Sequence, residues 1–203
     1  MKIICVGRNY TEHITELDNE RPEAPVLFLK PDTAVLSRRQ PFYIPDFTKD
    51  LHYEVEVLVK INRVGKHIEE KFAHKYYDEI GLGIDFTARD VQQKMKEKGL
   101  PWEKAKAFDN SAIIGEFISK DKFSSMEDIP FRLQKNDEVV QESNTSHMLW
   151  KIDELISYIS QYFTLKTGDV IFTGTPAGVA AVTEGDKLEG FIADKSMFTV
   201  DIR

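Results

Sequence analysis

The chain has 203 residues, and its 27 lysines and arginines against 34 aspartates and glutamates give a net charge of −7 with neutral histidines. A negative chain repels a phosphate backbone, so we expect no nucleic acid partner. The 41% hydrophobic and 30% charged residues are typical of a globular protein and argue against a disordered chain. A chain of this length buries roughly 70% of the surface that its unfolded form exposes. We therefore expect one domain, residues 1–203, that folds without disulfides.

Membrane and secretory signals are not found in the sequence. No apolar run approaches the roughly 18 residues of a membrane-spanning helix, and no basic and apolar leader opens the chain. The single cysteine, Cys5, lies in an apolar run and has no second cysteine with which to form an internal disulfide. We therefore expect a cytoplasmic protein with no membrane contact, in which Cys5 is a small buried side chain.

Tyr10, Ile14 and Leu17 recur at helical spacing and predict a first helix near the start of the chain. On this helix His13 and Glu16 are three residues apart, so they face the same way and can share a hydrogen bond. A carboxylate beside an imidazole raises the basicity of the ring, which suits the activation of a water molecule. A surface pair without a chemical role is the alternative.

Residues 53–61 predict a strand, because apolar side chains occupy every second position. The other face carries His52, Glu54 and Glu56. Two carboxylates on one face of a strand lie roughly 7 Å apart, which is close enough to converge on one cation. His52 is then placed to orient a metal ligand. The alternative is that this second face meets water.

Asp85 is the candidate for a third carboxylate. It lies in the short apolar segment 81–86, where an acidic residue is seldom buried without a partner. It also precedes a predicted helix, which a capping box of Thr87 and Asp90 opens and Gly99 closes, and a negative charge there is stabilised by about 0.3–1 kcal/mol. Three carboxylates favour a hard ion such as Mg²⁺, with about three coordination positions left for a chelating substrate.

Lys104 and Lys106 alternate with alanines in residues 101–109, and an extended chain would point both lysines the same way. Near a 2-oxo acid, one ammonium can stabilise an enolate or a carboxylate, and a solvated lysine is the alternative. Residues 174–178 follow a predicted strand and contain Thr175 between Gly174 and a proline. This segment can present hydroxyl and amide donors to a carboxylate, or it is a plain turn.

The rest of the chain adds short strands and one more helix. β-favouring runs between turn residues predict strands over 113–118, 131–134, 170–173 and 198–202. Ser146 can cap a helix whose apolar stripe runs from Leu149 to Ile159. Together the elements predict a strand-rich α+β domain with a few short helices.

Five segments of the sequence occur in this order in the fumarylacetoacetate hydrolase family. They are residues 7–10 with His13 and Glu16, 52–56, 83–92, 101–106 and 168–176. Over nearly its whole length the chain resembles the short, single-domain members of that family. These are the acylpyruvase, oxaloacetate decarboxylase and 2-hydroxyhepta-2,4-diene-1,7-dioate isomerase types.

This resemblance implies a fold, an assembly and a metal site. The fold would be a mixed β-roll, and the assembly a homodimer. The metal would be Mg²⁺ or Mn²⁺, held by Glu54, Glu56 and Asp85. The metal site, which residue spacing alone leaves open, thus becomes the central expectation.

The same resemblance assigns roles to further side chains. His13 and Glu16 would be a catalytic pair on a lid-like N-terminal segment, residues 1–20. The family's catalytic lysine corresponds to Lys106 and not to Lys104. The family's substrate-contacting glutamine and threonine match two residues here, and the resembling segment 83–92 also contains an arginine. The candidates for substrate binding are therefore Gln92, Thr175 and Arg89.

We expect an enzyme that acts on a small 2-oxo acid with a second carbonyl or carboxylate group. The metal, assisted by Lys106, would stabilise enolate charge at the C2 oxygen. The first hypothesis is carbon–carbon cleavage, by acylpyruvate hydrolysis or oxaloacetate decarboxylation. The alternative is an isomerase or tautomerase that uses the same enolate. A ligand-binding protein without turnover is a third hypothesis, and the His13–Glu16 pair argues against it.

Overall fold

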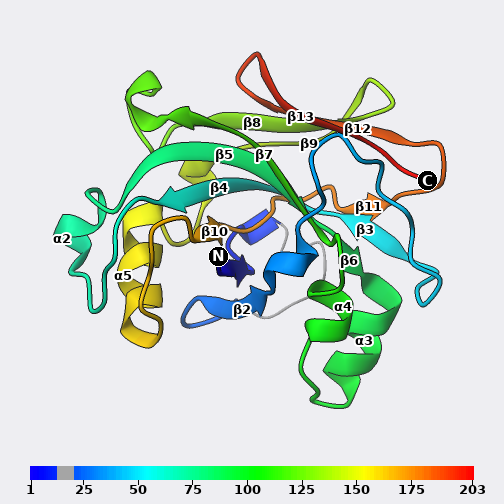
Figure 1. Cartoon of the computed structure of the whole chain (residues 1–203), viewed down its shortest axis with the longest axis horizontal. Coiled ribbons are helices and arrows are strands. Elements are labelled where there is room, and N and C mark those ends of the chain that lie inside the picture. The colour runs from blue at the N-terminus through cyan, green and yellow to red at the C-terminus, as the bar shows by residue number, and fades with distance from the viewer. Residues whose placement is uncertain (13–20) are drawn as a thin grey trace.

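The structure is a computed structural model and describes residues 1–12 and 21–203. Most elements in these ranges are short strands, which lie in three sheets (Figure 1). The strands are β1 (Ile3–Gly7), β2 (Val26–Lys30), β3 (Leu51–Tyr53), β4 (Val55–Ile61), β5 (Tyr77–Asp85), β6 (Thr87–Ala88), β7 (Ala112–Ser119), β8 (Pro130–Lys135), β9 (Glu138–Asn144), β10 (Val170–Phe172), β11 (Ala180–Ala181), β12 (Lys187–Ile192) and β13 (Lys195–Asp201). The helices are α2 (Glu70–Ala73), α3 (Arg89–Glu97), α4 (Glu103–Lys106) and α5 (Ile152–Tyr162), with 3-10 turns η1 (Asp32–Ala34), η2 (Lys120–Lys122) and η3 (Thr145–His147).

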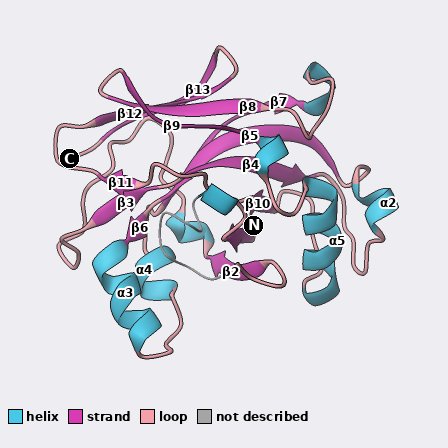
Figure 2. Cartoon of the chain, turned by 180° about the vertical axis from the view of Figure 1, so that it is seen from behind, coloured by secondary structure: helices cyan, strands magenta, loops and turns pink. Residues whose placement is uncertain are grey.

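The largest sheet has the strand order β2-β1-β10-β4-β5-β7. Strands β1 and β10 run parallel, and the other neighbouring pairs are antiparallel, so the sheet is mixed. A four-stranded sheet, β13-β12-β8-β9, lies over the long strands β4, β5 and β7, and a small sheet joins β11, β3 and β6 (Figures 1 and 2). Helix α5 lies at one end of the large sheet, and α3 with α4 at the opposite end (Figure 2). The predicted strand-rich α+β class is confirmed.

Strand β4 lies at the centre of the large sheet and is buried on both faces. Val55, Val57 and Val59 on one face belong to the main hydrophobic core. On the opposite face Leu58 packs in a second cluster that includes the fully buried Cys5. The alternative that the Glu54 and Glu56 face meets water is therefore wrong, because both carboxylates point into the protein interior.

Helix α5 carries the predicted apolar stripe but begins later than expected. Leu155 and Ile159 are fully buried in the main core. The prediction that Ser146 caps the helix is wrong, since residues 145–147 form a 3-10 turn and α5 begins at Ile152. The buried Asn9 explains the delay: its backbone oxygen accepts the N–H of Leu149, and its side-chain oxygen accepts that of Trp150. Residues 149–150 are thereby held outside the helix.

The predicted capping box of Thr87 and Asp90 is also wrong. Helix α3 begins at Arg89 after Ala88, and no side chain caps its N-terminus. The Thr87 hydroxyl instead accepts a hydrogen bond from Lys106 Nζ at 2.6 Å. Asp90 accepts the hydroxyl of Thr48 at 2.6 Å. Both side chains that local spacing assigned to the N-cap of helix α3 therefore bind residues that are distant in the sequence.

Part of the predicted first helix lies outside the described residues. Ile14 and Leu17, with the candidate catalytic pair His13 and Glu16, belong to residues 13–20. Tyr10 is described, and it is buried in the main core. Among the described helices, none is both long and apolar enough to cross a bilayer.

We predict that Gly83→Ala destabilises the fold where β5 pairs with β4 and β7. A Cβ at Gly83 would lie 2.1 Å from the backbone oxygen of Ile113 and 2.8 Å from Leu58 Cδ1. Overpacking of this kind costs about 1–3 kcal/mol, which lowers the melting temperature of a chain of this size by roughly 2–12 °C. Scanning calorimetry measures the change. Gly7→Ala is the control, because its Cβ would meet nothing closer than 3.8 Å, and equal melting temperatures for the two variants would contradict the prediction.

Candidate metal centre and active site

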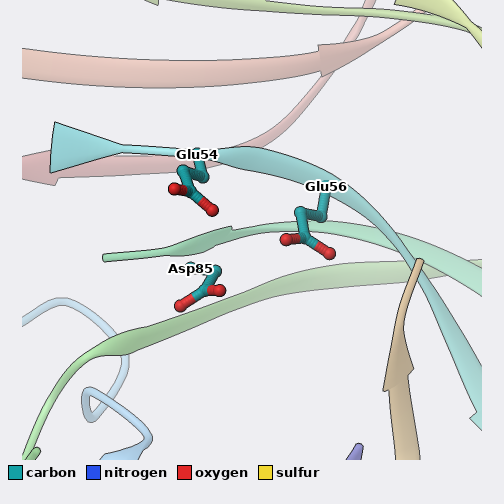
Figure 3. A group of neighbouring side chains, drawn as sticks. All are labelled: Glu54, Glu56 and Asp85. Atoms are coloured by element: carbon teal, nitrogen blue, oxygen red, sulfur yellow. The ribbon is translucent and has the colours of Figure 1, made fainter. Parts of the chain in front are cut away.

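Three carboxylates converge at one end of β4 and β5 (Figure 3). Glu54 is the single residue between β3 and β4, Glu56 is in β4, and Asp85 is the last residue of β5. The backbone N–H of Asp85 donates to the carbonyl of Glu54 at 2.9 Å, which places the two side chains side by side. One oxygen from each carboxylate lies within 4.8 Å of the other two. The exposed fractions are 5% for Glu54, 2% for Glu56 and 1% for Asp85.

Lys106 links two of these carboxylates. Its Nζ donates to Glu54 Oε2 and to Asp85 Oδ2, both at 2.7 Å. Residues 101–109 are not extended throughout, because helix α4 covers residues 103–106. On a helix, two residues two positions apart point in different directions, so Lys106 is buried whereas Lys104 is exposed. The choice of Lys106 over Lys104 thus agrees with the packing.

Two further cations contact the carboxylates. Lys30, with no exposed side-chain surface, places its Nζ 2.7 Å from Asp85 Oδ1 as an ion pair without hydrogen-bond geometry. The same ammonium donates to the Ser111 hydroxyl at 2.9 Å and to the backbone oxygen of Lys106. Arg89 donates to Glu54 Oε1 at 2.5 Å. Three carboxylates are thus matched by three cations, and the cluster is neutral overall.

Glu56 is the carboxylate that none of these cations contacts. Its Oε2 accepts the backbone N–H of Gly174 at 2.6 Å. Burial, followed by the charges of Asp85 and Glu54, raises the pKa of Glu56 well above its usual range, although Lys106 and the Gly174 amide act against this. A cation beside Glu56 would keep it ionised. Buried oxygen donors without a cysteine or histidine among them fit a hard divalent ion such as Mg²⁺ or Mn²⁺.

The Gly174 amide reaches Glu56 because the backbone there adopts a conformation that favours glycine. Gly174 has φ of +102°, and a Cβ at this position would lie 2.8 Å from Asn9 Cβ. Asn9 also donates its side-chain amide to the carbonyl of Thr173 at 2.7 Å. The segment after β10 is therefore fixed against the segment after β1, with one amide directed at the carboxylate cluster.

The carboxylates open into a cavity of about 40 Å³, which exceeds the roughly 10–15 Å³ that a single water molecule requires. Its polar lining includes the cluster and four more side chains: Arg8, Gln92, Lys96 and Thr175. Its apolar lining includes the aromatic rings of Phe28 and Trp102.

Gln92 and Thr175, two of the predicted substrate-binding residues, each keep a hydrogen-bond donor that can bind a ligand. Arg89 donates to Gln92 Oε1 at 2.8 Å, so the amide nitrogen of Gln92 remains to donate. The amide of Gln141 donates to Thr175 Oγ1 at 3.0 Å, so the Thr175 hydroxyl is able to donate its own proton. Arg89 lines the cavity as well, but its guanidinium is already bound by Glu54 and Gln92.

Four residues around the cavity were not predicted from the sequence. Lys30 precedes a proline and resembled an ordinary turn residue, and nothing in the local pattern indicates a buried ammonium. Gln141, which is 2% exposed, joins Thr175 to the N–H of Val55 through bonds across the fold. Arg8 lies in the segment 7–10, which contributes to the family resemblance but assigns it no role, and Lys96 lies among other charged residues of helix α3. His52, expected near the metal, contacts the cluster indirectly, because Arg89 Nε lies 3.5 Å from its Nδ1.

Comparisons with known proteins agree with this site. A family model described as fumarylacetoacetate (FAA) hydrolase C-terminal matches residues 2–203. Oxaloacetate tautomerase YcgM of Escherichia coli (strain K12) is 45% identical over 188 residues, which cover 92% of this chain and 86% of that protein. The mitochondrial oxaloacetate tautomerase FAHD1 of Bos taurus is 42% identical over 190 residues, with 94% and 86% covered. The chain therefore belongs to the fumarylacetoacetate hydrolase family.

A solved structure is similar over the whole chain. The crystal structure of fumarylpyruvate hydrolase from Pseudomonas aeruginosa, in complex with Mn²⁺ and pyruvate, has a TM-score of 0.93 at 35% identity. The comparison covers 100% of this chain and 89% of that one. Family membership and the buried carboxylate cluster together define a metal-dependent enzyme.

We predict that Glu56→Gln weakens divalent-metal binding by at least about 100-fold, since losing a charged ligand should exceed the 10–100-fold effect of losing an outer partner. Titration calorimetry with Mg²⁺ and Mn²⁺ measures the affinity. The raised pKa of Glu56 adds a pH dependence: protons compete with the metal, so wild-type affinity should fall by about tenfold per pH unit below that pKa. Glu116→Gln, at an exposed position on β7, is the control. An unchanged affinity in Glu56→Gln would refute this ligand assignment.

Proposed function

We propose that this chain is an oxaloacetate tautomerase that depends on a divalent metal ion. The observation that carries the proposal is the buried cluster of Glu54, Glu56 and Asp85 with Lys106 at its centre. Two relatives above 40% identity bear the name oxaloacetate tautomerase. Sequence reasoning placed carbon–carbon cleavage first and the tautomerase second, and these relatives give the second hypothesis the better support.

The charge of the site favours a doubly negative substrate. The three carboxylates are matched by Lys30, Lys106 and Arg89, so a divalent ion would give the cluster a net charge of about +2. A 2-oxo dicarboxylate at neutral pH carries two negative charges and would restore neutrality. Because opposite charges attract strongly in a buried site, this match supports a small dicarboxylate over a neutral ketone.

We assign a role in this reaction to the metal ligands and to Lys106, Gln92 and Thr175. A divalent ion bound by the carboxylates would supply a Lewis acid next to a 2-oxo group. Burial lowers the pKa of the Lys106 ammonium, but Asp85 and Glu54 outweigh burial and the net shift is upward. Lys106 therefore keeps its positive charge and stabilises negative charge on the C2 oxygen instead of acting as a base. The amide of Gln92 and the hydroxyl of Thr175 would orient the adjacent carboxylate.

Tautomerisation also needs a group that moves a proton. In the conversion of enol to ketone, the C2 hydroxyl loses its proton and C3 gains one. The pair His13 and Glu16 is our proposed carrier for this proton, on the strength of the family resemblance. We further propose that Mg²⁺ is the resident ion, with Mn²⁺ as its substitute, and that the chain works as a homodimer.

Hydrolysis of an acylpyruvate is the second candidate function. It is favoured by the similarity to the fumarylpyruvate hydrolase that was crystallised with Mn²⁺ and pyruvate. The two functions share the stabilised enolate, but hydrolysis also needs a water molecule to attack a distal carbonyl.

The test is the rate at which the enol absorbance of oxaloacetate decays in the presence of the purified protein and Mg²⁺. We expect catalysed decay that EDTA abolishes and added Mg²⁺ restores. Acetylpyruvate, with pyruvate release as the readout, and carbon dioxide release from oxaloacetate are measured in parallel. A protein that cleaves acetylpyruvate while leaving the tautomerisation rate at its background value would overturn the tautomerase assignment in favour of the hydrolase.

We predict that His13→Ala abolishes acetylpyruvate hydrolysis, if the wild-type protein has it, and lowers tautomerisation by roughly 10²–10⁴-fold. General acid–base catalysis is worth about this factor. The affinity for Mg²⁺ should be unchanged, because the cluster of ligands does not include His13. His67→Ala, which changes an exposed histidine, is the control. Full turnover in His13→Ala would mean that another group transfers the proton.

A further inference from the structure

The cavity contains more positive charge than its carboxylates require. Lys30, Lys106 and Arg89 contact the carboxylate cluster directly. Arg8 and Lys96 also line the cavity, and in the described part of the chain neither forms an ion pair or a hydrogen bond with an acidic side chain. Within the described residues, two cations that line the cavity thus have no acidic side chain as a partner and are placed to bind an added anion.

Lys96 lies near an aromatic side chain of the cavity lining. It is half-buried in helix α3, and its Nζ lies 5.9 Å from the centre of the Trp102 ring. Trp102 packs edge-on against Phe28 with 6.1 Å between ring centres. Lys106 Nζ lies 5.3 Å from the Phe28 ring. The two rings therefore form a wall with Lys106 and the carboxylate cluster at one ring and Lys96 at the other.

The surroundings of Lys96 are electrostatically positive. Burial lowers the pKa of its ammonium, and the charges of Arg8, Arg89 and Lys106 lower it further, against an opposing contribution from Glu54. An anion that entered beside Lys96 would relieve this repulsion. It would be attracted by several cations that little water screens, so it would bind more favourably than at an isolated exposed lysine.

We propose that Lys96 determines substrate specificity by binding the second carboxylate of a 2-oxo dicarboxylate. This inference rests on the proposed function in one respect: the first carboxylate and the 2-oxo group must lie at the metal cluster. The second carboxylate then extends along the Phe28–Trp102 wall toward Lys96. A substrate with an uncharged end gains nothing from this ammonium, so Lys96 favours dicarboxylates over their neutral-ended analogues.

The experiment compares oxaloacetate with its 4-methyl monoester, which has nearly the same shape but an uncharged end. The ratio of kcat/KM for the two compounds is measured for the wild-type protein and for Lys96→Met, with Mg²⁺ present. Methionine keeps an unbranched apolar side chain and removes the ammonium. Lys96→Arg tests rescue by a second cation, and Lys94→Met, at an exposed position on the same helix, is the matched control.

We expect Lys96→Met to lose about 10–100-fold in kcat/KM for oxaloacetate, the usual worth of a hydrogen bond to a charged group. The monoester should change by less than about twofold, and Lys96→Arg should retain the wild-type preference. An equal loss for both compounds would make Lys96 a structural residue and overturn the proposal, as would a loss for neither.

The affinities of the two compounds for the magnesium-loaded proteins, followed by tryptophan fluorescence, separate this inference from the proposed function. If the wild-type protein binds oxaloacetate in preference to the ester but does not tautomerise it, the proposed function fails. In that case the role of Lys96 is supported if Lys96→Met removes the binding preference, and it is overturned if the preference remains. A wild-type protein that binds both compounds equally well would overturn the specificity role directly.

Discussion

The burial of three carboxylates at one point is the constraint on which the rest of this structure depends. Ionised carboxylates within 4.8 Å of one another repel, and burial strengthens the repulsion. Three cations from different segments offset this repulsion by ion pairs with Asp85 and Glu54. They are Lys30, Lys106 and Arg89. Glu56 receives an amide and no cation from these segments, which makes it the place where a metal ion is most needed.

Several features of the surrounding fold hold these charged side chains in place. The cluster needs adjacent strands without bulky side chains between them, and β4 and β5 provide this because Gly83 pairs with Glu56 in their register. It needs an amide directed inward, which Gly174 provides through its positive φ. The short helix α4 provides the lysine, and the backbone oxygen at its last residue is bound by Lys30. The contacts that hold β4, β5 and α4 together are thus also the contacts that position the carboxylates and Lys106.

Local patterns in the sequence predicted the part of the site that local structure creates. The alternation in residues 52–61 put Glu54 and Glu56 on one face, and both are buried at the cluster. Asp85 and Lys106 needed the family resemblance to be chosen over equal alternatives. Lys30 and Gln141 could not be found, because their partners lie between 34 and 86 residues away along the chain. The wrong helix start at Ser146 has the same origin, since Asn9 acts on residues 149–150 from the other end of the chain.

Lys106 Nζ contacts both Glu54 and Asp85, so one amine fixes the spacing of two of the three proposed ligands. The same amine is the group that we assign to the C2 oxygen of the substrate. The two tasks are therefore coupled, because a substitution that shifts helix α4 moves the ammonium and also releases two carboxylates. Variants of this helix should change metal affinity and turnover together, whereas variants near Gly174 act on the Glu56 side of the cluster alone.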